Sequence, residues 1–346
     1  MSKAVTTSHM YKEAAYAAEG LRESGAAARR AAVAAAERLR DFQPDFIATC
    51  ARGSSDHAAT YAKYLIETRA RTPTFSHAPS ISSVFETTSP HFRRAALLAI
   101  SQSGHSPDLL LSVEAAKRAG SLILVMVNDA SSPLAKLADV LLPLQMGPEV
   151  SIAATKSFIA TLAQTLNLVA EWTDADDLRM AFEGLPNDLA NAWGMDWSAA
   201  VEPLSQVSSL FVLGRGLTLS IAQEAALKFK ETSGIHAEAF STAEVVHGPA
   251  ALITKGFPVL VFPPVDAASL GVREQVEAFQ QRGALTIVVG EGFGGDIVLP
   301  LGAGLRPAVA PIAMVQSFYG LVNAVAFARG HDPDRPPFLK KVTHTR

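Results

Sequence analysis

Short hydrophobic runs alternate with longer stretches of helical periodicity along the first half of the chain. The hydrophobic runs lie at residues 46–50, 95–100, 121–127 and 140–144. A stretch with helical spacing follows most of them, for example at 109–119. Continuous apolar strands that alternate with helices are typical of a parallel sheet that is buried on both faces. The pattern therefore predicts an α/β domain built around a parallel sheet.

The same order of elements recurs in the second half of the chain. Its hydrophobic runs lie at residues 210–213, 259–262, 285–289 and 297–301. A long helical run closes each half, at 157–170 and at 311–324. Self-similarity of this kind indicates that one domain is present twice. We therefore expect two tandem, similar α/β domains, each a doubly wound, flavodoxin-like parallel sheet flanked by helices.

The expected organisation has four segments. The Ala-rich stretch 11–40 predicts one or two helices, interrupted near Gly20 and Gly25. Residues 171–200, which are rich in charge, Asn and Trp, predict a helical connection between the domains. The segments are an N-terminal helical segment (1–40), a first domain (41–185), a second domain (186–330) and a C-terminal tail (331–346).

Composition and charge argue against nucleic acid as a partner. Hydrophobic residues make up 49% of the 346 residues and charged residues 18%, which is typical of a well-buried globular chain. The chain has 30 Lys and Arg against 33 Asp and Glu, with no long run of one sign. Phosphate-backbone binding depends on clustered positive charge, so we expect no nucleic-acid partner.

The single cysteine and the lack of targeting patterns bear on the compartment. Cys50 alone can form neither an internal disulfide nor a Cys-based zinc site. No apolar run approaches the roughly 18–20 residues of a membrane helix, and the first residues lack the apolar core of a secretory signal. We expect a cytoplasmic protein with no membrane partner.

Two serine-rich loops in the first half could bind an anion. Ser101-Gln-Ser-Gly-His-Ser-Pro-Asp108 stands between a predicted strand and a predicted helix, where a helix start offers free N–H groups to a phosphate. The alternative is that these serines only cap the helix. Arg52-Gly-Ser-Ser55 follows another predicted strand. Because ligands of open parallel sheets bind at the carboxyl ends of the strands, the two loops predict one phosphate site in the first half.

Ionisable residues gather in the second half. Glu224, Lys228 and Glu231 share one face of a predicted helix. A solvated, salt-bridged stripe is the alternative for such spacing. Two histidines and two more carboxylates follow within a short span: His236, Glu238, Glu244 and His247. A lone histidine is more often structural than catalytic, but His247 precedes Gly-Pro, which predicts a turn that presents the ring from a loop.

Several well-known site motifs are absent from the sequence. Leu219 stands where a dinucleotide fingerprint starting at Gly214 would have its third glycine. There is no P-loop, no His-Glu-x-x-His motif and no Gly-x-Ser-x-Gly elbow. The histidines also lack metal-ligand spacing, so we expect neither a metal site nor a cofactor.

The sequence contains seven ordered motifs from about residue 45 onward. They are Arg52-Gly-Ser-Ser, Ser101-Gln-Ser-Gly, Ala153-Ala-Thr-Lys156, Glu224-Ala-Ala-Leu-Lys-Phe-Lys-Glu231, His236-Ala-Glu-Ala-Phe, His247-Gly-Pro and Leu339-Lys-Lys-Val-Thr343. Together they resemble the motifs of the sugar isomerase (SIS) family. Within it, the chain is similar to the isomerase domain of glucosamine-6-phosphate synthases and to SIS-type glucosamine-6-phosphate deaminases.

The resemblance implies roles for individual residues. Glu231 would shuttle a proton between C1 and C2 of the sugar, and His247 would assist ring opening. A C-terminal lysine would enter the sugar pocket: Lys341 by its spacing from Leu339, or Lys340 if the alignment is fixed on the following Val-Thr. Lys228 is also expected to be a catalytic residue. The implied substrate- and phosphate-binding residues are Ser54, Ser55, Ser101, Gln102, Ser103, Ser106, Ala153, Thr155 and Glu224.

Two departures from the synthase pattern affect the expected reaction. Ala154 replaces the serine that precedes Thr-Lys in the synthases, so one hydrogen bond to the sugar or phosphate is missing. Glutamine-dependent members carry a cysteine nucleophile directly after the initiator Met, whereas this sequence has Ser2. We therefore expect the glutamine-independent direction, in which glucosamine 6-phosphate gives fructose 6-phosphate and ammonia.

The resemblance also implies a homodimer in which His247 reaches across the interface. Two other functions stay open on the sequence alone. One is another phosphosugar isomerase, or a deglycase acting on fructosyl-amine 6-phosphates. The other is a sugar-phosphate sensor without catalysis, although the residues before the first predicted strand are too few and insufficiently basic for a DNA-binding domain.

Overall fold

The computed structural model describes residues 5–339 and Lys341, which form two compact units. Unit 1 contains residues 5–18, 150–155 and 185–339. Unit 2 contains residues 19–149 and 156–184, together with Lys341. Two helices contribute residues to both units: α1 (His9–Phe42) and α7 (Asp176–Trp193).

Helix α1 is continuous, so the predicted interruptions near Gly20 and Gly25 are wrong. A glycine inside a helix costs only about 1 kcal/mol relative to alanine. The neighbouring residues are mostly Ala, Leu, Arg and Glu, which favour helix and offset that cost. In unit 2 the helix also buries one apolar face, which includes Ala32, Ala35 and Leu39.

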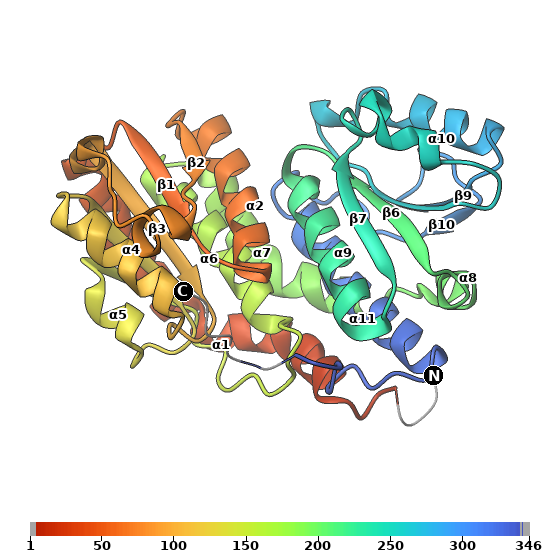
Figure 1. The fold of residues 1–346 in the computed structure, drawn as a ribbon, viewed down its shortest axis with the longest axis horizontal. Coiled ribbons are helices and arrows are strands. Elements are labelled where there is room, and N and C mark those ends of the chain that lie inside the picture. Colours follow the sequence, from red (N-terminus) through yellow and green to blue (C-terminus); the bar gives the residue numbers. More distant parts are fainter. Residues whose placement is uncertain (1–4, 340, 342–346) are drawn as a thin grey trace. The chain divides into compact units, whose positions relative to one another are not determined.

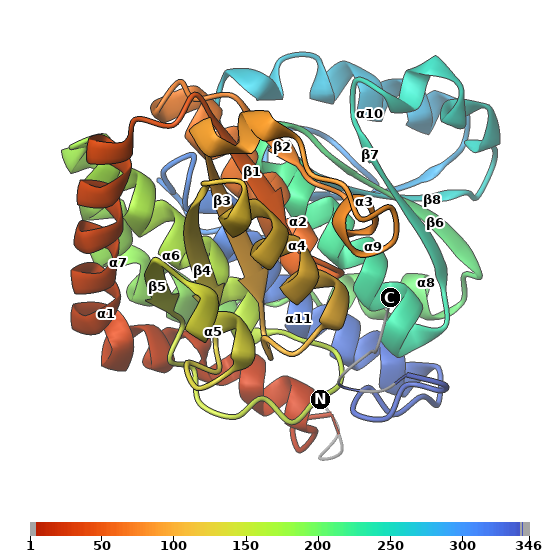
Figure 2. The ribbon, with the colours of Figure 1, turned by 60° about the vertical axis from the view of Figure 1, so that its left-hand side comes forward.

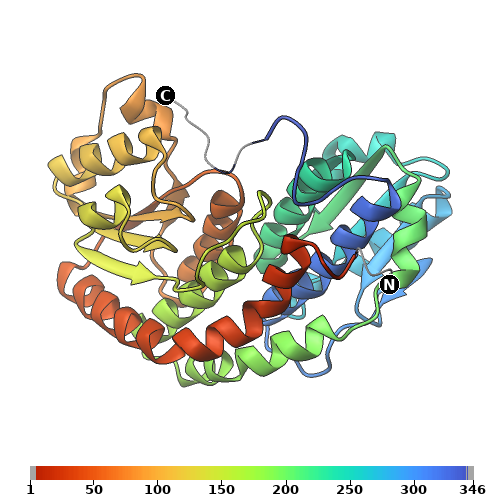
Figure 3. The ribbon, with the colours of Figure 1, turned by 90° about the horizontal axis from the view of Figure 1, so that it is seen from below.

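Ion pairs fix the unit 2 part of α1 against its neighbours. Arg29 lies 3.4 Å from Glu171 at the end of α6 (Lys156–Trp172) and 2.9 Å from Glu183 on α7. Figure 3 shows α1 and α7 running alongside each other. The expected helical connection between the domains is therefore present as α7.

The sheet of unit 2 has five parallel strands in the order β2-β1-β3-β4-β5 (Figure 2). Parallel crossovers are right-handed, so the reversal of direction after β2 places α2 and α4 on opposite faces. The strands are β1 (Phe46–Cys50), β2 (Thr74–Ser76), β3 (Ala95–Ser101), β4 (Leu122–Val127) and β5 (Val140–Pro143). The remaining helices are α2 (Ser54–Arg69), α3 (Pro79–Ser83), α4 (Pro107–Arg118) and α5 (Pro133–Leu137).

The sheet of unit 1 repeats this topology, with the order β7-β6-β8-β9-β10 (Figure 1). Its strands are β6 (Ser209–Gly214), β7 (His236–Ser241), β8 (Pro258–Phe262), β9 (Leu285–Val289) and β10 (Ile297–Leu299). Its helices are α8 (Val201–Ser205), α9 (Leu219–Ser233), α10 (Val272–Gln281) and α11 (Ala310–Ala328). Two tandem parallel-sheet domains of one topology confirm the predicted fold class.

One strand in each sheet was not predicted, and both lie at the same edge position. β2 pairs only with β1, and β7 pairs only with β6. The eight predicted strands read as apolar runs because most are buried on both faces, and β3 and β4 are buried at every residue. In β2 only Thr74 is buried, and in β7 only Ala237 is buried. These partly exposed edge strands carry polar side chains, which hide the strand signal.

Helix α11 forms the centre of the core of unit 1. It packs against α8 and α9, and its Phe318 ring lies 5.3 Å from the Phe229 ring and 6.0 Å from the Phe262 ring. Among the described residues, α11 is the one helix that by length and composition could cross a membrane. No such stretch was expected from the sequence. Of that stretch, 89% is buried inside the protein.

Replacing Phe318 with alanine should test the aromatic core of unit 1. The side chain is fully buried, so its removal leaves a cavity and should lower the free energy of unfolding by about 3–5 kcal/mol. Leu270→Ala is the control, because Leu270 is 82% exposed and should change stability by less than about 0.5 kcal/mol. Urea unfolding followed by tryptophan fluorescence measures both. Equal effects of the two variants would contradict the packing described here.

Candidate functional site

The two serine-rich loops of unit 2 leave the sheet side by side. Strands β1 and β3 are adjacent and parallel, and Cys50 at the end of β1 pairs with Ala99 near the end of β3. Ser54 and Ser55 then open α2, and Ser101, Gln102, Ser103 and Ser106 lie in or beside the connection from β3 to α4. The structure thus brings together the six residues of the predicted phosphate site within one unit.

A tight turn shapes the loop between β3 and α4. The Gly104 N–H donates a hydrogen bond to Ser101 Oγ at 2.9 Å. Gly104 has φ +69°, and a Cβ there would lie 2.2 Å from Ser132 Oγ, so the turn requires glycine. Ser106 is the N-cap residue of α4, yet its side chain makes no capping hydrogen bond. Capping therefore does not account for the Ser106 hydroxyl. The backbone of the first turn offers little to an anion, because Pro107 has no N–H and the Leu109 N–H donates to Asp108 Oδ1.

An ion pair joins the two loops. Asp108, in the first turn of α4, is fully buried, and Arg52 Nη2 lies 2.8 Å from its Oδ2. A buried carboxylate is costly without a partner, so this contact ties the start of α4 to the loop between β1 and α2. The sequence motif ends at Asp108 but gives this residue no role, because no local pattern shows that its carboxylate pairs with an arginine 56 residues away.

The segment between β5 and α6 contains buried residues of the predicted site. Ala153 and Thr155 are both buried. Glu13 of α1 holds the same segment, because its carboxylate accepts hydrogen bonds from the N–H groups of Val150 and Ser151. Glu13 was not predicted, since it lies far away in the sequence.

A second unpredicted carboxylate lies beside the C-terminal lysine. Glu149 is buried and accepts hydrogen bonds from the backbone N–H and the hydroxyl of Ser157. Lys341 Nζ lies 3.8 Å from Glu149 Oε2. Lys340, the other candidate for the active-site lysine, falls outside the described residues, as do residues 342–346.

Helix α9 of unit 1 carries a buried cluster of three charges. Lys228 Nζ lies 3.3 Å from Glu224 Oε1 and 2.5 Å from Glu231 Oε2. The side chains of Glu224 and Lys228 are 0% and 1% exposed, whereas that of Glu231 is 21% exposed. A solvated stripe of charges is therefore the wrong interpretation. The helix buries the first two residues and leaves the last carboxylate open to solvent.

The two carboxylates keep Lys228 charged. Burial by itself lowers the pKa of the Lys228 ammonium group. The negative charges of Glu224 and Glu231, and their hydrogen bonds to the ammonium, outweigh burial and raise its pKa from 10.5 to about 12. Lys228 is thus a fixed positive charge near neutral pH, and Glu231 is the carboxylate of the cluster that solvent can reach.

Tyr319 completes this cluster and was not predicted. It is fully buried on α11, and its hydroxyl donates a hydrogen bond to Glu224 Oε1 at 3.2 Å. The two residues are 95 positions apart, so no local pattern joins them. The contact supplies Glu224 with a donor besides Lys228, as a buried carboxylate requires.

His247 lies on an exposed loop, as its position before Gly-Pro predicts. It ends a short 3₁₀ turn (Val245–His247), and its backbone N–H donates to the Glu244 carbonyl at 2.9 Å. No hydrogen bond or ion pair joins His247 to the α9 cluster within the described part of the chain. The exposed imidazole is accessible to a ligand or a second chain.

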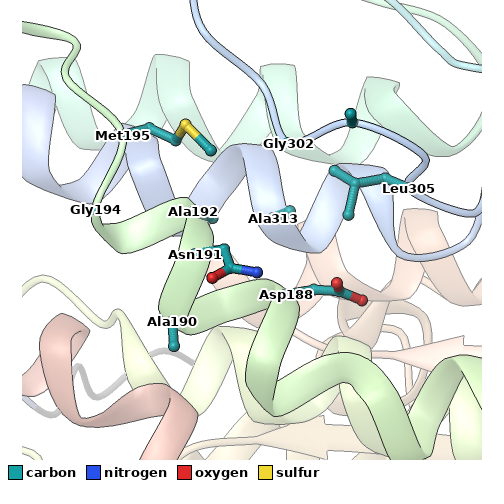
Figure 4. A pocket seen from close by; sticks show the side chains of 10 residues that line it. Asp188, Ala190, Asn191, Ala192, Gly194, Met195, Gly302, Leu305 and Ala313 are labelled. Carbon is teal, nitrogen blue, oxygen red and sulfur yellow. The ribbon is translucent and has the colours of Figure 1, made fainter.

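Unit 1 also contains a cavity away from these residues. It has a volume of about 420 Å³ and lies between α7, the loop at 302–305 and α11 (Figure 4). None of the predicted site residues lines it. Within residues 5–339, no group of three or more His, Cys, Asp or Glu side chains is placed to hold a metal ion.

Replacing Tyr319 with phenylalanine should show how much the hydroxyl stabilises the cluster. Hydrogen bonds to charged groups contribute about 1.5–3 kcal/mol, so the free energy of unfolding should fall by that amount. Tyr11→Phe is the control in the same unit, because the Tyr11 hydroxyl has no hydrogen-bond partner among the residues that the structure describes. Urea unfolding measures both variants, and an unchanged stability of Tyr319→Phe would show that Glu224 does not need this donor.

Comparison with known proteins supports the assignment of the fold to a family. The model of the SIS domain matches residues 42–170 and 203–297, which is more than half of the chain. The glutamine--fructose-6-phosphate aminotransferase [isomerizing] of Mycolicibacterium smegmatis is 33% identical over 327 residues. That match covers 88% of this chain and 51% of the relative, so the chain spans about half the length of the curated relative.

Solved structures agree with the sequence relatives. A protein from Silicibacter pomeroyi DSS-3 with a proposed phosphosugar isomerase function is 38% identical, with a TM-score of 0.90 and coverage of 94% of this chain and 100% of that chain. The C-terminal domain of glucosamine-fructose-6-phosphate aminotransferase from Francisella tularensis is 26% identical, with a TM-score of 0.83 and coverage of 97% and 100%. With two matched segments and two sheets of one topology, this chain belongs to the SIS domain family of phosphosugar isomerases.

Proposed function

We propose that this chain is an amino-sugar-phosphate isomerase and deaminase, which converts glucosamine 6-phosphate and water to fructose 6-phosphate and ammonia. The observation that carries the proposal is the α9 cluster. Glu231 has a partly exposed carboxylate beside Lys228, a buried ammonium group that stays charged near neutral pH. Such a carboxylate can take a proton from one sugar carbon and return it to the next, which is the central step of aldose–ketose isomerisation.

The other residues serve the remaining steps of the proposed reaction. The sugar ring must open, which requires an acid or base near its ring oxygen, and the exposed imidazole of His247 can fill this role. The serine loops of unit 2 offer hydroxyl and N–H donors to the phosphate. The phosphate is remote from the reacting carbons, so its binding energy can orient them without taking part in the chemistry. Loss of the amine follows proton transfer, when water hydrolyses the resulting imine.

Release of ammonia is the direction that these residues support by themselves. A glutamine-dependent reaction needs a thiolate nucleophile to free ammonia from glutamine. Cys50 is the only cysteine in the 346 residues, and it is buried. Burial raises the pKa of its thiol to about 12, so it is not a thiolate near neutral pH. The proposed reaction needs no ammonia donor and no cofactor.

Replacing Glu231 with glutamine should abolish ammonia release. The amide has the same shape but cannot accept the sugar proton, so we expect kcat to fall by at least about 100-fold. Glu277→Gln is the matched control on the exposed face of α10, where the carboxylate pairs only with Arg273, and it should keep wild-type activity. The assay measures ammonium release from glucosamine 6-phosphate.

Three outcomes would contradict the proposed function. Undiminished release after Glu231→Gln would place the base elsewhere. Wild-type turnover of galactosamine 6-phosphate or a fructosyl-amine 6-phosphate, but not of glucosamine 6-phosphate, would favour another phosphosugar isomerase or a deglycase. Tight binding of the phosphosugar without any turnover would favour a sensor.

The active form proposed here is a homodimer in which His247 of one copy serves the Glu231 of its partner. Its exposure on a loop without a contact to the α9 cluster supports this arrangement. Glu231→Gln and His247→Ala should each be inactive alone. Mixed after unfolding and refolding, they should regain about a quarter of wild-type activity, because half of the dimers are mixed and one of their two sites is intact. No recovery, or a fully active monomer in sedimentation, would contradict the shared site.

A further inference from the structure

We propose that Arg52 is a phosphate-binding residue and supplies the positive charge that the serine loops lack. The inference deepens the proposed function, on which it rests for the identity of the phosphosugar. The six predicted phosphate-binding residues are all uncharged: Ser54, Ser55, Ser101, Gln102, Ser103 and Ser106. A phosphate monoester carries about −1.5 to −2 charges near pH 7, and its burial against neutral donors alone would be costly.

Arg52 lies where the two serine loops leave the sheet. It is the second residue after β1 and precedes Ser54 and Ser55 by two and three residues. Its Nε and Nη2 atoms donate hydrogen bonds to one oxygen of Asp108, Oδ2, at 2.9 and 2.8 Å. Asp108 belongs to the first turn of α4, directly after the Ser101 to Ser106 loop. The guanidinium therefore bridges the starts of the two helices that would receive the phosphate.

Asp108 fixes the orientation of this guanidinium. The carboxylate is fully buried, and its second oxygen, Oδ1, accepts the Leu109 N–H at 2.8 Å. Two hydrogen bonds to Oδ2 hold the planar guanidinium in one position. The Arg52 side chain nevertheless remains 51% exposed, and its Nη1 donates no hydrogen bond to any described residue. Arg52 thus presents a preorganised donor edge to a ligand.

No other side chain of the two loops carries a permanent positive charge. Between β1 and α2, and between β3 and α4, His105 is the only other residue that can carry a positive charge. It is exposed, and its Nδ1 lies 2.7 Å from the Ser103 carbonyl of its own loop. Arginine is always protonated, and its fork of donors matches phosphate oxygens. Arg52 is therefore the residue on these loops that is best suited to bind a phosphate.

A purely structural role for Arg52 makes a different prediction, because Arg52 also neutralises a buried carboxylate. Arg52→Met would leave Asp108 unpaired, and its negative charge would repel phosphate even if Arg52 never touched the ligand. The double variant Arg52→Met/Asp108→Asn removes both charges and keeps similar side-chain volumes. If Arg52 is only the partner of Asp108, this double variant should bind phosphate as the wild type does. If Arg52 binds the ligand, the double variant should stay weak.

The test is calorimetric titration of the full chain with inorganic phosphate and with glucosamine 6-phosphate. We expect Arg52→Met and the double variant to bind both ligands about 10- to 100-fold more weakly, the range for lost hydrogen bonds to a charged group. Asp108→Asn alone keeps the arginine and should bind inorganic phosphate at least as tightly as the wild type. Circular dichroism melts identify any variant that does not fold, and the neutral double variant avoids the unpaired carboxylate.

Wild-type affinity in the double variant would overturn the proposal, and so would a wild-type chain that binds no inorganic phosphate. The readout is separate from that of the proposed function, because binding is measured without turnover. Arg52-dependent phosphate binding without ammonium release would uphold this inference and refute the deaminase. Ammonium release with unchanged phosphate affinity in both Arg52 variants would refute this inference and support the deaminase.

Discussion

The burial of Lys228 between two carboxylates is the constraint on which the chemistry of unit 1 depends. Taking one ammonium and two carboxylates out of water is costly unless every charge has close partners. Lys228 meets this requirement through Glu224 and Glu231, and Glu224 gains a further donor from Tyr319. The packing of α11 against α9 therefore holds the proposed acid/base group as well as the core. It leaves Glu231 as the member of the cluster that solvent and a ligand can reach.

Duplication gave the two units one topology but different chemistry at equivalent places. Helix α2 follows the second strand from the edge in unit 2, and α9 follows the second strand from the edge in unit 1. In α2 the first residues, Ser54 and Ser55, offer donors at the helix start. In α9 the charged residues lie along the buried body of the helix. One position in the fold thus carries the proposed anion site in one unit and the proposed proton-transfer residue in the other.

Local patterns in the sequence were sufficient to predict most of the fold. Strands that are buried on both faces read as apolar runs, and the repetition of these runs revealed the duplication. The edge strands β2 and β7 escaped detection because they are partly exposed and carry polar side chains. The break predicted in α1 was wrong because helix-favouring neighbours and tertiary packing outweigh two glycines.

The site was predictable only where its residues form short motifs. The serine loops and the Glu224 to Glu231 spacing are local, so the sequence indicated them. Asp108, Glu149 and Tyr319 act through partners that the fold, and not the local sequence, brings close. The sequence did not show that Glu224 and Lys228 are buried, since the same spacing of charges fits a solvated helix face as well as a buried cluster.

The central claim is that the α9 cluster delivers the Glu231 carboxylate to the reacting carbons of a phosphosugar. A crystal structure of the chain with the reduced, open-chain form of glucosamine 6-phosphate tests it most directly. The account predicts a Glu231 carboxylate oxygen within about 3.5 Å of C1 or C2 of the bound sugar. A sugar bound with both carbons beyond reach of Glu231, beside a different carboxylate, would contradict it.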